Sequence, residues 1–255
     1  MYTEEQLTQL EQEERTITDE AILAMLAILA SLKSDLEVEL RNFYSKYGKD
    51  GVVTYAEARK WASTADHRRR LTVLMFYVNE NFDRLFTNLT PKFKQMLEDV
   101  IGKEIKFFDV EIPNVADKPL SERWGADEKT WLDRLDDDVA LWCVYILTDI
   151  KRNILKSGDI NSLIGQLDKR FKSMSSVLET LGLSESTAVG SMARREIFKS
   201  RGITKYQFYT KPDERRCETC GAMHGLVFPI SAYEVGVTAS PIHPRCRCWE
   251  APIVD

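Results

Sequence analysis

The sequence lacks any apolar run long enough to cross a membrane. The longest such runs, residues 21–30 and 139–147, are far shorter than the ~20 residues that a membrane-spanning helix needs. The N-terminus is polar and acidic, whereas a secretory signal starts with basic residues and continues into an apolar segment. We therefore expect a protein that works in a reducing cytoplasm and has no membrane partner.

Motifs that commonly carry catalysis are also absent from the sequence. It contains no Gly-rich phosphate loop, no HExxH and no Ser/His/acid arrangement, and only three histidines. Basic residues are in the minority, with 35 Lys and Arg against 40 Asp and Glu, which argues against a protein that coats nucleic acid. The chain is therefore expected not to be an enzyme and to act by docking to partners.

Cysteine is scarce, but it is concentrated near the end of the chain. Four of the five cysteines and two of the three histidines lie between residues 217 and 248. A C-x2-C pair is followed by an H-x2-C pair and one more cysteine, and two such pairs commonly supply the tetrahedral ligands of Zn²⁺. The candidate ligands are Cys217, Cys220, His243, Cys246 and Cys248.

This spacing predicts one structural Zn²⁺ with four of these residues as ligands. Both residues of the C-x2-C pair and His243 are expected to bind, together with either Cys246 or Cys248. The H-x2-C geometry favours Cys246, but Cys248 lies two residues further along an extended segment and would face the same side.

Other interpretations of these residues stay open. His224 is a further candidate ligand, although Gly225 beside it indicates a turn. A catalytic zinc would need an open ligand position and a nearby general base, so the surplus of candidates favours a closed site. Free thiols and two disulfides are the alternatives, and disulfides require an oxidising compartment. A redox C-x2-C pair would need a βαβ context that is not evident.

Residues 1–103 are expected to be helical. Apolar residues recur there at steps of three and four, as on one face of a helix; they include Ile22, Met25, Leu26, Leu29, Leu32, Leu36, Leu40 and Phe43. Thr90-Pro91 predicts a helix start, and residues 105–112 are compatible with a short strand. Gly182 is expected to end one helix and Ser184 to open the next.

The residue pattern of the sequence changes from helical to β-like after residue 202. Residues 206–209 and 226–228 are short β-like runs, and Pro229, Pro241 and Pro244 follow them. A segment of about 50 residues with so few apolar residues to bury needs an additional stabilising link, which a bound metal can supply. The predicted fold is mainly α, a multi-helix body with a small C-terminal β-containing, zinc-ribbon-like module (α+β).

Three segments near the C-terminus follow one another in a recognisable order. Residues 213–220 place an aspartate ahead of the C-x2-C pair, residues 224–228 form a turn that ends in phenylalanine, and residues 241–248 read Pro-Ile-His-Pro-Arg-Cys-Arg-Cys. Together they resemble the phage Mu F-like head morphogenesis domain of minor capsid proteins. Residues 191–196 resemble the family's A-R-T-E element, with Arg195 in place of threonine. The Trp, Arg and Gly often found upstream in members are matched by Trp124, Arg134 and Gly158.

The resemblance covers about residues 120–255 and implies a domain organisation. It implies an N-terminal helical region (1–119), a helical part of the head morphogenesis domain (120–202) and a Cys/His-rich β module (203–255). It also implies a low-copy minor capsid protein of a tailed bacteriophage, found in the virion head and, during assembly, in the host cytoplasm. The expected partners are the portal protein, the major capsid or scaffolding protein and phage DNA. The expected role is structural, in procapsid assembly and in DNA packaging or ejection.

Two other functions remain in competition with this one. A zinc-ribbon nucleic-acid-binding protein would use basic residues around the ligands, for which the candidates are Arg215, Arg216, Arg245 and Arg247. A metal-dependent hydrolase would need a carboxylate beside an open metal position, for which Glu218 and Glu250 are weak candidates.

Overall fold

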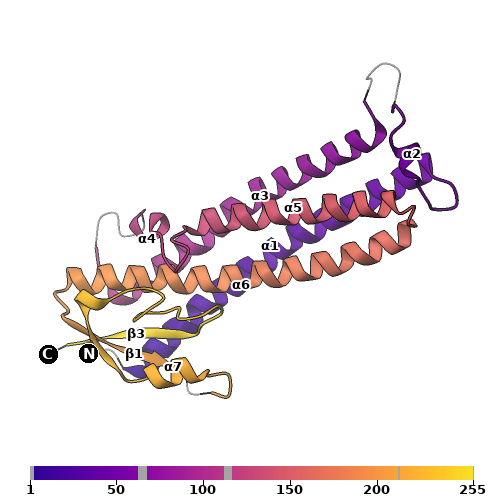
Figure 1. Ribbon diagram of the computed structural model, residues 1–255. Helices are drawn as coiled ribbons and strands as arrows, with labels where there is room; N and C mark the ends of the chain where they lie inside the picture. Colours follow the sequence, from indigo (N-terminus) through magenta and orange to yellow (C-terminus); the bar gives the residue numbers. More distant parts are fainter. Residues whose placement is uncertain (1–2, 63–67, 112–116, 212, 255) are drawn as a thin grey trace. The chain divides into compact units, whose positions relative to one another are not determined.

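The computed structural model describes residues 3–62, 68–111, 117–211 and 213–254. Most of them are helical, and a small three-stranded sheet is formed near the C-terminus (Figure 1). The elements are α1 (Glu4–Tyr47), α2 (Tyr55–Ala58), α3 (Arg70–Phe108), α4 (Asp117–Ser121), α5 (Trp131–Leu155), α6 (Ile160–Ser200), β1 (Lys205–Thr210), α7 (Glu218–Met223), β2 (Val227–Pro229), the 3-10 helix η1 (Ile230–Ala232) and β3 (Cys248–Ile253).

This architecture confirms the predicted fold class, a mainly helical body followed by a small β-containing module. The likeness of that module to a zinc ribbon stays a prediction. Among the described helices, none is both long and apolar enough to span a membrane.

The apolar stripe predicted in the first helix is its buried face. Along α1, side chains at steps of three and four are at most 5% exposed: Ile22, Met25, Leu29, Leu32, Leu36, Leu40 and Phe43. Burial of each such side chain stabilises the fold by roughly 1.5–3 kcal/mol. The spacing of apolar residues in the sequence therefore correctly identifies the side of α1 that packs in the interior.

The helix start predicted at Thr90-Pro91 is wrong, because α3 runs through it without interruption. A proline inside a helix lacks the amide proton of one backbone hydrogen bond and costs about 3 kcal/mol relative to alanine. Leu89 and Phe93 on either side are fully buried, and Pro91 itself faces solvent. Apolar burial on both sides of the proline thus outweighs the local preference for a break.

The short strand predicted at residues 105–112 is also wrong. Residues 105–108 form the last turn of α3, and Ile112 lies outside the described residues. Phe108 is 1% exposed and packs edge-on against Phe198 of α6, with ring centroids 5.6 Å apart. This aromatic contact favours the helical ending.

Gly182 does not end a helix, since α6 continues through both it and Ser184. A Cβ atom at Gly182 would lie 2.9 Å from the side chain of Ile22 in α1, closer than real Cβ atoms approach their neighbours. The glycine is therefore explained by a close helix–helix approach, which outweighs the loss of helix propensity of about 1 kcal/mol.

Contacts divide the chain into two compact units. The first comprises Met1–Leu23, Pro91–Arg134 and Glu179–Asp255, and the second Ala24–Thr90 and Leu135–Leu178. The predicted domain boundaries at residues 119 and 202 concern the extent of a family domain and stay predictions.

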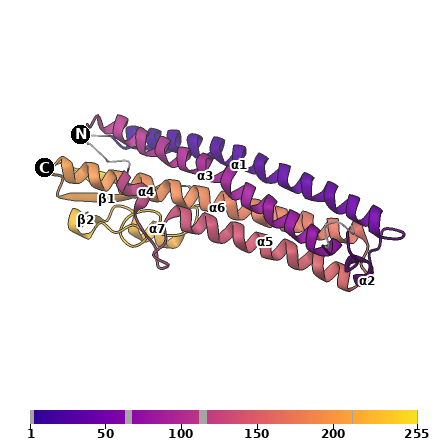
Figure 2. The ribbon, with the colours of Figure 1, turned by 90° about the horizontal axis from the view of Figure 1, so that it is seen from above.

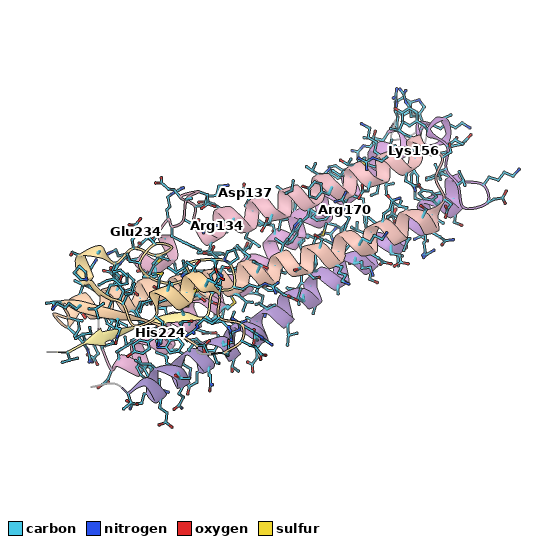
Figure 3. All side chains as sticks on the ribbon, turned by 60° about the horizontal axis from the view of Figure 1, so that its bottom comes forward. Arg134, Asp137, Lys156, Arg170, His224 and Glu234 are labelled. Carbon is cyan, nitrogen blue, oxygen red and sulfur yellow. The ribbon has the colours of Figure 1, made fainter. Side chains whose placement is uncertain are left out.

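In the second unit, polar contacts join buried parts of the helices. The Tyr44 hydroxyl in α1 donates a hydrogen bond of 2.6 Å to Asn153 in α5. Arg170, labelled in Figure 3, projects from α6 and forms an ion pair of 2.7 Å with Asp149 of α5. Within this unit α3 and α5 run side by side (Figures 1 and 2), and the Cys143 thiol contacts Asn79 across them at 3.3 Å.

In the first unit, the C-terminal sheet packs on the last part of α6 (Figure 2). The strand order is β2-β1-β3 and both pairings are antiparallel. Tyr206 and Trp249 belong to one buried cluster with Met192 and Phe198 of α6. Phe208 packs among cysteines, and the pairing of Thr210 with Cys248 fixes where that cysteine lies.

Candidate metal centre

The predicted ligand pairs come together at one end of the C-terminal sheet. Among the described residues, two groups of side chains could each hold a metal, with ligand atoms within 4.8 Å of one another: Cys217, Cys220 and His243 form the first, and Cys220, Cys246 and Cys248 form the second. Cys220 belongs to both. Tertiary folding thus gathers all five candidates, although 22 residues separate the two sequence motifs.

Local structure explains how the first pair is aimed. Cys217 is the N-cap residue of α7, and its sulfur accepts a hydrogen bond from the backbone amide of Cys220 at 3.3 Å. This cap turns both thiols of the C-x2-C pair toward the same point. The second pair follows a tight turn in which Cys246 N–H donates to the carbonyl of His243 at 3.2 Å.

The spacing of the ligand atoms suits a tetrahedral metal. With Zn–S bonds of about 2.3 Å, two sulfurs at corners of a tetrahedron lie about 3.8 Å apart. The Cys220 and Cys246 sulfurs are 3.8 Å apart, and His243 Nε2 is 3.2 Å from the Cys220 sulfur. The residues present therefore fit the group expected from the sequence.

His243 is also oriented by its other ring nitrogen. Its Nδ1 lies 2.8 Å from the carbonyl oxygen of Pro244, so a proton on Nδ1 would be donated to that carbonyl. Metal-binding histidines commonly hold one N–H in this way, which leaves the other nitrogen with a free lone pair. Here that nitrogen is Nε2, the atom nearest Cys220.

The thiols carry unequal proton affinities because they crowd one another. Burial raises the pKa of Cys220 to about 12. A hydrogen bond from Cys248 is the main reason that the pKa of Cys246 falls to about 6, and the same contact raises the pKa of Cys248. Without a positive charge such a cluster favours one thiolate at a time, whereas a divalent cation stabilises several together.

His224 is placed differently from the other candidates. Its Nδ1 accepts a hydrogen bond from the backbone amide of Thr210 at 3.2 Å, and its ring packs edge-on against Tyr209. It lies in the C-terminal module (Figure 3) but belongs to neither group of candidate ligands found among the described residues. Its role in this structure is to tie the end of α7 to β1.

An ion pair joins the two segments that carry the ligands, and the spacing argument alone did not reveal it. Both Nη atoms of Arg247, between Cys246 and Cys248, lie 2.6 Å from the two carboxylate oxygens of Asp213, upstream of the C-x2-C pair. Arg247 thereby lowers the pKa of Asp213 to about 2. Both residues lie in the segments that resemble the family, 213–220 and 241–248, and this was the sequence feature that pointed to them.

A second polar cluster connects the module to the helices of the same unit. Arg194 of α6 is 4% exposed and is surrounded by three glutamates from three other elements. Its Nη1 lies 2.9 Å from Glu250 of β3 and its Nη2 lies 3.3 Å from Glu14 of α1, while Nε donates to Glu104 of α3.

A comparison of the sequence with known protein families finds a match that includes the C-terminal module. Residues 145–250 match the family model described as Phage Mu protein F like protein. Over this segment the chain is similar to the phage Mu F-like family of minor capsid proteins. No curated protein and no solved structure matches the chain.

The matched segment contains α6, β1, β2, the start of β3, all five candidate ligands and Arg194. The match supports a phage head morphogenesis protein and suggests an association with the virion.

Two residues from the family-like pattern lie upstream of the matched segment, yet they meet it in space. The Arg134 guanidinium stacks over the Trp124 ring at 4.4 Å. Both side chains donate to Glu185 of α6, Arg134 at 2.8 Å and Trp124 at 2.9 Å. Within this unit these contacts join residues upstream of the family match to α6.

The Arg194 cluster leads to a prediction about pH. Burial is the largest cause raising the pKa of Glu14 and of Glu104, and their mutual repulsion also raises that of Glu14. A carboxyl whose pKa is higher in the folded state stabilises the fold most below its unfolded pKa of about 4.3, and this contribution is lost as pH rises through the folded value. We expect Glu104→Gln to lose less unfolding free energy than the wild type as pH rises above that range.

Urea titrations at a series of pH values measure this difference. Glu13→Gln is the matched control, because Lys103 lowers the pKa of this exposed carboxyl, so its charge is constant in the range tested. If the free energy of unfolding changed with pH in the same way for the wild type and Glu104→Gln, the prediction would be contradicted.

Proposed function

We propose that the protein is a structural head protein that binds the portal vertex of a tailed phage during procapsid assembly. The observation that carries the proposal is the family match over residues 145–250. In this proposal the protein acts by docking rather than by catalysis. Contacts with the major capsid or scaffolding protein, and with DNA during packaging or ejection, belong to the same proposal.

We further propose that a structural Zn²⁺ holds the C-terminal module together. Support comes from the gathering of four thiols and one imidazole into two groups that share Cys220, with His243 and Cys246 each at a suitable distance from its sulfur. Cys217, Cys220, His243 and Cys246 would hold the metal, with Cys248 the alternative fourth ligand. When bound, the ion supplies positive charge that keeps the thiolates together. The buried sulfurs of Cys220, Cys246 and Cys248 pack against Phe208, which suits a closed structural site.

The nucleic-acid-binding alternative gains no specific support. Two of the four arginines near the ligands are engaged in ion pairs, Arg247 with Asp213 at 2.6 Å and Arg245 with Glu179 at 3.3 Å. Phosphate binding at these two positions would have to compete with carboxylates already in place.

The hydrolase alternative is also disfavoured by geometry. Glu250 is fully buried and receives hydrogen bonds from Arg194, Tyr233 and the Ser240 amide, so it is not available as a general base. Neither metal-capable group of the described residues includes a carboxylate.

Association with the portal is tested by co-expressing the chain with the portal protein of the same phage and sedimenting the products. We expect the chain to co-migrate with the assembled portal, because a minor head protein must recognise that ring. The portal of an unrelated phage is the matched control, and the major capsid protein is tested in parallel. If the chain did not sediment with the portal protein, either free or assembled, the proposed portal role would be wrong.

A further inference from the structure

A groove between α3 and α5 in the second unit has the features of a docking site. It measures about 540 Å³, and the described residues that line it are Tyr55, Arg59, Arg69, Leu71, Thr72, Met75, Val144, Leu147, Thr148 and Lys151. Sites that bind ligands or side chains are commonly of this size and mainly apolar in lining. The groove is distant in sequence from the candidate metal ligands and plays no part in the centre described above.

The floor of the groove is apolar and incompletely covered. Val144 is 55% exposed, and Leu141 and Tyr145 on the same face of α5 are 44% and 39% exposed. Leu71 and Met75 of α3 are half-buried on the opposite wall. Contiguous apolar surface of this kind typically marks an interaction site.

The rim of the groove is positively charged. Arg59, Arg69 and Lys151 line it, and no acidic residue does so among the described part of the chain. Glu57, the acid on neighbouring α2, is already paired with Lys60 at 2.6 Å and Arg70 at 3.7 Å. On α5, Asp149 is paired with Arg170 at 2.7 Å. These two acids therefore do not neutralise the positive charge of the rim.

We propose that this groove binds an acidic amphipathic helix of a partner protein. Two parallel ridges of helical side chains leave a channel that a third helix fills with residues at i, i+3, i+4 and i+7. Leucine-like side chains would cover the floor between α3 and α5, and flanking carboxylates would pair with Arg59, Arg69 and Lys151. A nucleic acid would meet the same cations but would leave the apolar floor without a matching surface. The inference does not depend on the portal role.

The test uses a synthetic amphipathic peptide of about 18 residues, long enough to form a helix on binding. It carries leucine at i, i+3, i+4 and i+7 and glutamate on the flanks, with a twin in which lysine replaces glutamate. Fluorescence anisotropy with the full chain measures binding. We expect the acidic peptide to bind, binding to weaken with added salt, and the lysine twin to bind at least about tenfold more weakly.

Variants of exposed residues locate the site without disturbing the core. Lys151→Glu and Val144→Asp are each expected to weaken the acidic peptide about tenfold, while Lys172→Glu, an exposed lysine on α6, leaves binding unchanged. Circular dichroism checks that each variant is folded. Absence of binding, equal binding of the twin, or indifference to both groove variants would overturn the proposal. Displacement of the peptide by a DNA oligonucleotide, or a dimer that Val144→Asp dissociates, would instead assign the groove to nucleic acid or to a second copy of the chain.

Discussion

Replacing Arg194 by methionine is expected to lower the free energy of unfolding by about 3–5 kcal/mol. Methionine has a similar length but no charge, so Glu14, Glu104 and Glu250 would be left buried without their common partner. Glu14 Oε1 and Glu104 Oε2 already lack a hydrogen-bond partner among the described residues, so no spare donor can take over. The loss should affect α1, α3 and β3 together, because each contributes one of the carboxylates.

Urea denaturation followed by circular dichroism measures this loss. Arg15→Met is the matched control, since Arg15 forms an exposed pair with Asp19 at 3.4 Å, and pairs of that kind contribute about 0–1 kcal/mol. Combining Arg194→Met with Glu104→Gln should recover part of the stability, and this double variant also serves if the single one does not fold. A loss below about 1 kcal/mol for Arg194→Met would show that the cluster is solvated.

Removal of the metal is expected to unfold the C-terminal module while most of the helical signal remains. Cys220→Ser should have the largest effect of the cysteine substitutions, because Cys220 belongs to both groups of candidate ligands. Metal binding by thiolates is coupled to folding, since the ligands gather only in the folded module. Chelation of the wild type should give the same result as the substitution.

Metal analysis under reducing conditions, combined with limited proteolysis, decides this prediction. We expect one zinc per chain in the wild type and much less in Cys220→Ser, with new cleavage between residues 205 and 254. Cys143→Ala is the matched control, because this cysteine contacts Asn79 in the second unit and should leave the metal content unchanged. A zinc-free wild type whose module resists protease would show that packing or disulfides hold it instead.

The same experiment separates the two candidates for the fourth ligand. The 3.8 Å distance between the Cys220 and Cys246 sulfurs favours Cys246, so Cys246→Ser should lose more metal than Cys248→Ser. The absorption spectrum of the Co²⁺-substituted protein reports the number of thiolate ligands independently. An equal loss in both variants would indicate that the two cysteines share the position.

The sequence by itself determined the features that depend on short-range spacing. The buried face of α1 follows from apolar residues at steps of three and four, because the helical period places them on one side. The C-x2-C and H-x2-C pairs identify the candidate ligands, because two intervening residues allow a turn to aim both side chains at one point. The helical fold with a small β module and the family resemblance follow from the same local patterns.

Only the tertiary structure decided the features that depend on partners far apart in the chain. Pro91 and Gly182 look like helix boundaries locally, but buried neighbours of Pro91 and the approach of Ile22 to Gly182 keep both inside long helices. Arg194 resembles an ordinary exposed arginine in sequence, and its three glutamates are 56 to 180 residues away. Local propensities amount to about 1 kcal/mol per residue or less for most residue types, whereas a buried side chain or an unpaired buried charge is worth several times more. Long-range packing therefore overrides local signals where the two conflict.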